Sequence, residues 1–219
     1  MTIERLLNAS RDIWDSYHVH PFVQGIKDGT LDKEKFKFYM VQDYLYLIQY
    51  TKVFAVGIEK ADDLRIMQYF AKYIDQILNG EMAIQRSYLN RLGVSNEEVE
   101  QAQMSLDNHS YTSYMLNAAA TGGAAEVCAA ILSCAISYEE IGKRILQEAP
   151  ESVNHPFYGE WCAGYSGDEY AKGNEVRVEM FEELTKDCNE AQLQKLETIF
   201  VNCSRYEKVF WDMAWEMRP

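Results

Sequence analysis

The sequence predicts a single all-α domain, a bundle of long helices around one core. Apolar residues recur at helical spacing through most of the 219 residues, and no alternating stretch is long enough to predict a strand. Hydrophobic residues make up 47% of the chain, which is sufficient for a substantial core. Because neither an internal repeat nor a linker divides the sequence, we expect residues 1–219 to form one domain.

Four helices are predicted in the first half of the chain, ending near residues 17, 28, 56 and 93. The first is amphipathic and stops before the break at His20-Pro21. Thr30 or Asp32 can cap the third helix, and Asp62-Asp63 can start the fourth. Short polar side chains suit these positions because they accept hydrogen bonds from the free amides of a helix N-terminus.

The second half of the chain is predicted to be equally helical. A capping box at Ser95-Asn-Glu-Glu98 opens a short helix. Further helical segments are predicted over about residues 110–121, 124–148, 155–164, 168–187 and 190–216.

Charge and cysteine content exclude several classes of function. A formal net charge of −13 argues against nucleic acid or an anionic membrane surface as a partner. The N-terminus shows no signal-peptide pattern, and no apolar run reaches membrane-spanning length. The five cysteines are odd in number and lack CxxC spacing, so they predict neither a disulfide framework nor a zinc site. These features predict a reduced, cytoplasmic enzyme.

Cys134 lies in the longest apolar helical stretch, one turn before Tyr138, so a thiol and a phenol share one helix face. Such a cysteine is either a small buried hydrophobe or, with polar neighbours in an enclosed space, a nucleophile. Asp43 lies in the most aromatic helix, where a carboxylate is costly without a partner. It faces solvent, makes a structural hydrogen bond or belongs to a site.

Three further residues allow two interpretations each. Tyr111 is either a core or capping residue or part of a site. Glycines flank Tyr165 at positions 164 and 167, which indicates close backbone approach or a turn that aims the ring. Glu207 lies between an aromatic and a charged helix face, where most glutamates face water.

Six short motifs connect these residues, in order from the first helix to Trp211. They are His20-Pro-Phe-Val-Gln-Gly-Ile26, Gln42-Asp-Tyr-Leu-Tyr-Leu47, Ser110-Tyr-Thr-Ser113, Cys134-x-x-x-Tyr138-Glu139, Gly164-Tyr-x-Gly167 and Tyr206-Glu-x-x-Phe-Trp211. In this order and spacing the chain resembles the TenA family, the thiaminase II enzymes or aminopyrimidine aminohydrolases. The resemblance implies a heme-oxygenase-like helical bundle, and this fold does not by itself imply heme.

The resemblance also implies a role for each candidate residue. Cys134 is the expected nucleophile, Glu207 the proton donor, and Tyr46 a neighbour that raises the reactivity of the thiol. Asp43 is expected to hold the amino and ring-nitrogen edge of a pyrimidine. The remaining expected pocket residues are Tyr111, Tyr138 and Tyr165.

The implied substrates are 4-amino-2-methylpyrimidines that carry a leaving group on the 5-methylene: an amine in the salvage substrate, the thiazolium in thiamin. Thiolate addition to the ring expels the leaving group, water adds to the exocyclic methylene, and the thiol departs. Neither a cofactor nor a metal is implied, and a homotetramer is expected. Ala135-Ile136-Ser137 replaces aromatic residues that the family often has, so a different pocket wall is expected.

Two alternatives remain. A metal enzyme on the same fold would need two acid–histidine pairs, whereas the four histidines offer only Asp15-x-x-His18. His18 and His20 are therefore expected to cap or pack. A regulator without activity is the second alternative, although the sequence has no DNA-binding motif and keeps every candidate catalytic residue. Cys128, Cys162, Cys188 and Cys203 are expected to be structural or exposed thiols.

Overall fold

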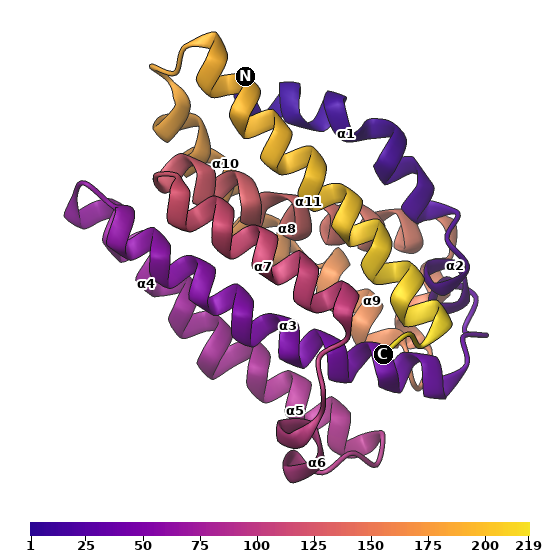
Figure 1. Cartoon of the computed structure of the whole chain (residues 1–219). Coiled ribbons are helices and arrows are strands. Elements are labelled where there is room, and N and C mark those ends of the chain that lie inside the picture. Colours follow the sequence, from indigo (N-terminus) through magenta and orange to yellow (C-terminus); the bar gives the residue numbers. More distant parts are fainter.

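The computed structural model describes all residues, Met1–Pro219, and its regular elements are all helical (Figure 1). The all-α prediction is therefore confirmed. No helix is both long and apolar enough to cross a membrane. The α-helices are α1 (Thr2–His18), α2 (Pro21–Lys27), α3 (Lys33–Lys60), α4 (Leu64–Asp75), α5 (Met82–Arg91), α6 (Asn96–Gln101), α7 (Leu106–Thr121), α8 (Ala124–Glu148), α9 (Gly159–Ser166), α10 (Asp168–Thr185) and α11 (Glu190–Glu216).

Most predicted boundaries agree with the structure, and the caps explain why. Asp32 accepts a hydrogen bond from the Glu34 amide at the start of α3, as expected of one of its two candidate caps. The Ser95 capping box opens α6. The helix predicted from 110 begins earlier, at 106, because the Ser105 hydroxyl accepts from the Asn108 amide.

Two predicted helices, the one ending near residue 93 and the one over 155–164, were wrong in detail. The helix expected to run unbroken to 93 contains a π-helical turn, Gln76–Glu81, between α4 and α5. Such turns insert an extra residue and re-aim the side chains that follow. The segment expected over 155–164 instead has a 3₁₀ turn, Pro150–Asn154, and α9 begins only at Gly159.

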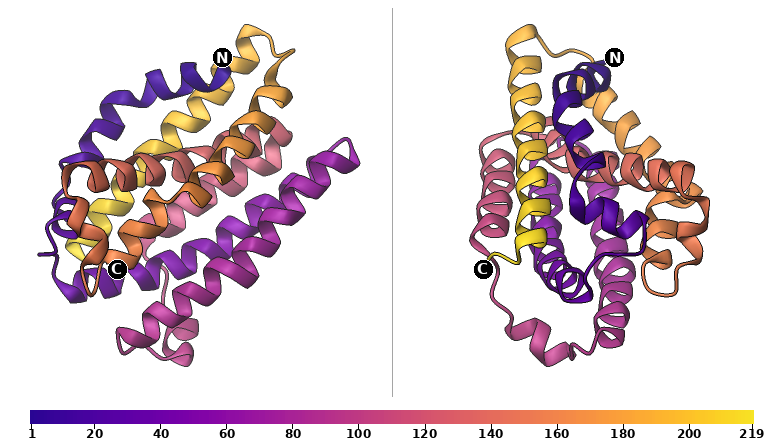
Figure 2. Two further views of the ribbon diagram at one scale, coloured as in Figure 1. Left: turned by 180° about the vertical axis from the view of Figure 1, so that it is seen from behind. Right: turned by 90° about the vertical axis from the view of Figure 1, so that its right-hand side faces the viewer.

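α8 is the central helix and packs against α3, α7, α9, α10 and α11. α3 and α4 form a hairpin along one side of the bundle, and α1 runs beside α11 on another (Figures 1 and 2). One continuous cluster of buried apolar and aromatic residues joins these helices. The bundle therefore surrounds α8, the helix that carries Cys134.

Buried hydroxyls fix how α11 lies on α8. The Ser204 and Ser133 hydroxyls are 2.9 Å apart, and the Trp14 indole donates to Ser204 Oγ at 2.9 Å. All three side chains are fully buried, so these contacts cannot be exchanged for water without cost. Ser133 is the residue directly before Cys134, and Ser204 lies one turn before Glu207. The contact between the two serines therefore brings the Cys134 thiol and the Glu207 carboxyl to the same level of the bundle.

A close contact between α8 and α9 depends on Gly142. A β-carbon at this position would lie 2.6 Å from the Tyr165 backbone, which no side chain could occupy without a shift. Gly142 lies one turn after Tyr138, so the contact places Tyr165 next to Tyr138. The glycine that allows the approach is therefore in α8, whereas a β-carbon at Gly164 would meet nothing within 4 Å.

Candidate active site

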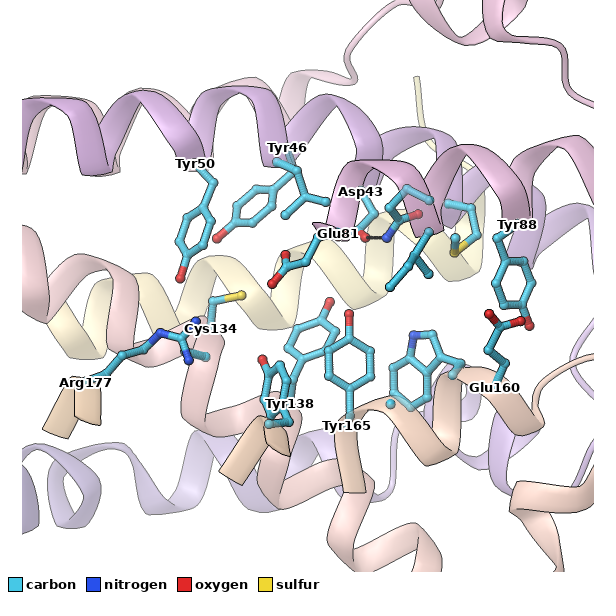
Figure 3. A pocket seen from close by; sticks show the side chains of 18 residues that line it. Asp43, Tyr46, Tyr50, Glu81, Tyr88, Cys134, Tyr138, Glu160, Tyr165 and Arg177 are labelled. Carbon is cyan, nitrogen blue, oxygen red and sulfur yellow. Dashed lines mark hydrogen bonds between the residues drawn. The ribbon is translucent and has the colours of Figure 1, made fainter. Parts of the chain in front are cut away.

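A cavity of about 230 Å³ lies between α3, α5, α8, α9 and α10, and most of its lining is hydrophobic or aromatic (Figure 3). The predicted site residues that line it are Asp43, Tyr46, Cys134, Tyr138 and Tyr165. Glu207 and Tyr111, the two others, do not line the cavity. They lie behind it, where their interactions connect them to Cys134.

The Cys134 thiol is exposed to the cavity from the middle of α8 (Figure 3). Burial and the neighbouring Glu207 carboxylate raise the pKa of this thiol well above its ordinary value. The Tyr46 hydroxyl beside it lowers that pKa, but its effect is smaller than that of burial. In the free protein the thiol is therefore protonated, and a substrate must help to ionise it.

Glu207 is buried, with 2% of its surface exposed, so the solvent-facing interpretation is wrong. The Tyr111 hydroxyl donates a hydrogen bond of 2.8 Å to Glu207 Oε1, while Oε2 is buried without a partner. Burial raises the pKa of this carboxyl to about 7, although Tyr111 and Cys134 lower it. A carboxyl with such a pKa can give up or take a proton near neutral pH.

Asp43 is also buried, with 6% of its surface exposed, and it lines the cavity. The side-chain amide of Gln85, from α5, donates to Asp43 Oδ2 at 2.5 Å. Burial and the carboxylates of Glu81 and Glu207 raise the pKa of Asp43 to about 8, while Gln85 lowers it. The carboxyl is therefore mostly neutral at pH 7 until a cationic or hydrogen-bonding ligand favours its ionised form.

Aromatic side chains form one wall of the cavity. The Tyr138 and Tyr165 ring centres are 4.8 Å apart, and Trp161 lies at the same distance from Tyr165. Behind them, Tyr39 donates to the Tyr138 hydroxyl and accepts from the Trp161 indole, both at 3.3 Å. Tyr138 and Trp161 are tilted by 56° and 62° against Tyr165, so these fixed rings form a rigid wall on which a planar heterocycle can stack against the face of one ring.

The three residues after Cys134 face different surroundings. Only Ala135 lines the cavity. Ile136 lies on the outer side of α8, and the buried Ser137 hydroxyl donates to the Cys134 carbonyl at 3.1 Å. The absence of aromatic residues here therefore leaves space beside the thiol, at Ala135.

Several cavity residues were missed by sequence reasoning, namely Tyr50, Glu81, Gln85, Trp161, Tyr170 and Arg177. One signal was available, since Glu81 and Gln85 are four residues apart and share a helix face. Arg177 offered none, because an arginine on a charged amphipathic helix ordinarily faces water.

The histidines cap and pack, as predicted. His20 Nδ1 accepts from the Phe22 amide at the start of α2, and its Nε2 lies 3.1 Å from Asp212. His18 Nε2 lies 3.0 Å from Glu140. No three His, Cys, Asp or Glu side chains are grouped so that they could hold a metal ion.

The site thus combines a thiol, a carboxyl poised for proton transfer, a second carboxyl and flat aromatic walls. A thiol can add to an electron-poor ring, the carboxyl can protonate a departing group, and the second carboxyl can bind an amidine-like edge. The arrangement suits covalent catalysis on a small, planar, nitrogen-rich substrate.

Comparisons with known proteins agree with the geometry. Residues 7–217 match the model of the TENA/THI-4/PQQC family. The aminopyrimidine aminohydrolase of Halalkalibacterium halodurans is 45% identical over 213 residues, covering 97% of this chain and 95% of that protein. The aminopyrimidine aminohydrolase of Helicobacter pylori is 42% identical over 211 residues, covering 96% and 97%.

Solved structures show the same fold. The TenA homologue of P. horikoshii OT3 superposes with a TM-score of 0.89 at 29% identity, covering 99% of both chains. A domain with a heme oxygenase-like fold from Shewanella denitrificans OS217 superposes with a TM-score of 0.78 at 18% identity, covering 98% of this chain and 92% of that one. The predicted heme-oxygenase-like bundle is therefore confirmed.

Proposed function

Since this chain belongs to the TENA/THI-4/PQQC family, we propose that it is an aminopyrimidine aminohydrolase of thiamin salvage. Its hydrolase class follows from relatives of that name at 45% and 42% identity over almost the whole chain. The proposed reaction converts 4-amino-5-aminomethyl-2-methylpyrimidine and water to the 5-hydroxymethyl compound and ammonia. The observation that supports it best is that Cys134 and Asp43 line one aromatic cavity, while Glu207 lies directly behind Cys134 and contacts it.

Substrate binding is assigned to Asp43 and the aromatic wall. The pyrimidine ring lies against Tyr138 and Tyr165, and its 4-amino group and N3 face the Asp43 carboxyl. The partly protonated ring then stabilises the Asp43 carboxylate and reverses the rise in its pKa. Gln85 holds the carboxylate in the orientation that the ring needs.

The first chemical step forms a covalent intermediate. Cys134 Sγ adds to ring C6, next to the carbon that carries the methylene, as the thiol proton moves to a ring nitrogen or to Glu207. The electrons returned by the ring break the bond between the methylene and the leaving nitrogen. Glu207 gives a proton to that nitrogen, so the amine departs as a neutral or protonated molecule.

The second step releases the product. Water adds to the exocyclic methylene and gives up a proton to the Glu207 carboxylate, which restores the acid. The carbon–sulfur bond breaks, the ring regains aromaticity, and Cys134 recovers its proton. Tyr111 holds Glu207 through both steps, and Tyr46 stabilises the thiolate while it is charged.

The same chemistry supports cleavage of thiamin to the hydroxymethylpyrimidine and the thiazole alcohol, because the thiazolium is also a leaving group on the methylene. We include this activity in the proposal.

We also propose a homotetramer in the cytoplasm, where the five free cysteines would stay reduced. Exposed apolar side chains such as Val19, Leu64 and Leu106 are available for subunit contacts, and light scattering would measure the mass.

The decisive experiment incubates metal-free protein with the aminomethylpyrimidine and, separately, with thiamin. Ammonia release and hydroxymethylpyrimidine formation are followed by coupled assay and chromatography. Turnover is expected for the wild type and is expected to vanish in Cys134→Ser, whose fold should be retained because the change is nearly isosteric. Unchanged turnover in that variant would remove Cys134 as nucleophile, and no turnover of either compound by the wild type would overturn the proposed function.

A further inference from the structure

One end of the cavity carries a buried guanidinium, that of Arg177 from α10, with 8% of its surface exposed. It lies 4.2 Å from the centre of the Tyr73 ring, and its Nη1 donates to Asn174 Oδ1 at 2.9 Å. Nε is buried without a hydrogen-bond partner, and no carboxylate lies within 4.0 Å of the guanidinium. A buried cation without a counterion is costly, so this position is suited to an anionic ligand.

Glu81, the last residue of the π-helical turn, also lines the cavity, and in Figure 3 it lies between Asp43 and the Cys134 thiol. Its carboxylate makes neither an ion pair nor a hydrogen bond with the protein. Burial raises the pKa of Glu81, and the charge of Arg177 lowers it, so the two groups interact across the cavity without touching. Figure 3 shows the Cys134 thiol between them, and the charges of all three groups act on the pKa values of the buried Tyr50 and Tyr170 phenols.

The position of these charges relative to the pyrimidine matters, and here the inference rests on the proposed function. Asp43 binds one edge of the ring, and Cys134 adds to the carbon beside the one that carries the methylene. The methylene and its leaving group therefore lie on the Cys134 side of the ring. That side leads to Arg177 and Glu81.

We propose that this end of the cavity is a leaving-group subsite for an amine that carries a carboxylate, as in a pyrimidinylmethyl amino acid. Arg177 binds the carboxylate of the leaving group, and Glu81 lies beside its ammonium. A carboxylate fits better than a phosphate, because the subsite has a single cation and a neighbouring carboxylate that would repel a dianion. Arg177 and Glu81 thereby extend the range of amines that the enzyme removes.

The reaction balances as it does for the simple amine. The bond between the methylene carbon and the secondary nitrogen breaks, and the carbon gains a bond to the oxygen of water. The nitrogen receives one proton, so the products are the hydroxymethylpyrimidine and a free amino acid. No oxidant, reductant or further reactant is needed.

The test compares two synthetic substrates, in which the 5-methylene carries glycine or glycinamide through its nitrogen. They have nearly the same shape and differ in the charge that Arg177 would bind. We expect the wild type to prefer the glycine compound in kcat/KM by about tenfold or more, as for a charge-assisted hydrogen bond. In Arg177→Met the ratio should fall to about one, and Arg177→Lys should retain part of it.

Arg65→Met is the matched control, because Arg65 is an exposed arginine that pairs with Glu183 away from the cavity, and the ratio should stay as in the wild type. A purely structural role of Arg177 would lower both rates in parallel and leave the ratio unchanged, which would overturn the subsite. The absence of a preference for the glycine compound in the wild-type enzyme would also overturn the subsite. This result does not depend on whether any variant folds. Failure to turn over the simple aminomethylpyrimidine would instead overturn the proposed function, together with the subsite that depends on it.

Discussion

The two buried carboxyls of the site, Asp43 on α3 and Glu207 on α11, look alike but are placed differently. Each accepts one hydrogen bond from a neutral donor, Asp43 from the Gln85 amide and Glu207 from the Tyr111 phenol. Asp43 lines the cavity, whereas Glu207 lies behind it. Burial raises both pKa values, to about 8 for Asp43 and about 7 for Glu207.

The difference in pKa comes from neighbouring charge. Asp43 is raised further because the carboxylates of Glu81 and Glu207 both oppose its ionisation. The pKa of Glu207 is instead lowered by two neighbours, Tyr111 and Cys134. A carboxyl that has a pKa near 7 and touches the thiol is suited to proton transfer. A carboxyl that becomes ionised only beside a cationic partner is suited to binding such a partner. Position and charge thus support the proposed division of two similar residues into an acid and a binding group.

The largest expected effect comes from Glu207→Gln. The amide keeps the shape but has no proton to give, so kcat should fall by about 100-fold or more. KM should change little, because Glu207 does not line the cavity. Single-turnover and steady-state kinetics measure both values, and a wild-type kcat would remove Glu207 as the acid.

Asp43→Asn should give the opposite kinetic pattern. Loss of the charged acceptor should weaken substrate binding and lower kcat/KM by about 10-fold to 100-fold, mainly through KM. Isothermal titration of substrate into Cys134→Ser and into the double variant Cys134→Ser/Asp43→Asn measures the change in binding affinity directly. If Asp43→Asn and Glu207→Gln had the same kinetic defect, the division of roles between the two carboxyls would be wrong.

The raised pKa values also predict how stability depends on pH. Both carboxyls hold protons more tightly in the folded protein than in the unfolded chain, where their pKa values are about 4. Their stabilising effect is complete below that pH and is lost as pH rises through about 7 and 8. Asp43→Asn should therefore gain stability relative to the wild type between pH 5 and pH 9, on the order of 4 kcal/mol.

Urea unfolding of the ligand-free proteins across this pH range measures that difference. Glu190→Gln is the control, because the pKa of Glu190 is lowered by Arg5 and not raised, and neither group titrates in this pH range. A constant difference between Asp43→Asn and the wild type would show that Asp43 has an ordinary pKa in the folded protein.

The smallest expected effect is that of Tyr111→Phe. Its hydroxyl favours the ionised form of Glu207, so its removal should raise the pKa of Glu207. The acid then stays protonated to higher pH, and the basic limb of the kcat profile should move upward, while kcat near pH 7 changes roughly threefold. Tyr114→Phe, on the same helix, removes a hydroxyl that contacts Asn202 instead and should leave the profile in place.

The sequence by itself determined the helical architecture, and its resemblance to a family supplied the reactive residues that we propose. Periodicity and caps predicted α8 and α11 with their observed bounds, because the burial pattern along a long amphipathic helix is written into its residues. The six motifs indicated Cys134, Asp43 and Glu207 through the family that they resemble, because the helical pattern alone left each residue open to a structural interpretation. Neither the periodicity nor the motifs specify the distances between side chains on different helices or the charges that surround each of them.

Only the tertiary structure decided how these residues act. The π-helical turn, which a continuous helical pattern conceals, directs Glu81 and Gln85 to the cavity. The Ser133–Ser204 contact sets the level at which Glu207 meets Cys134. Burial, which raises the pKa values of the thiol and both carboxyls, and the free guanidinium of Arg177 depend on what neighbouring helices place around each group. Such neighbours are far apart in the chain, so local sequence patterns cannot specify them.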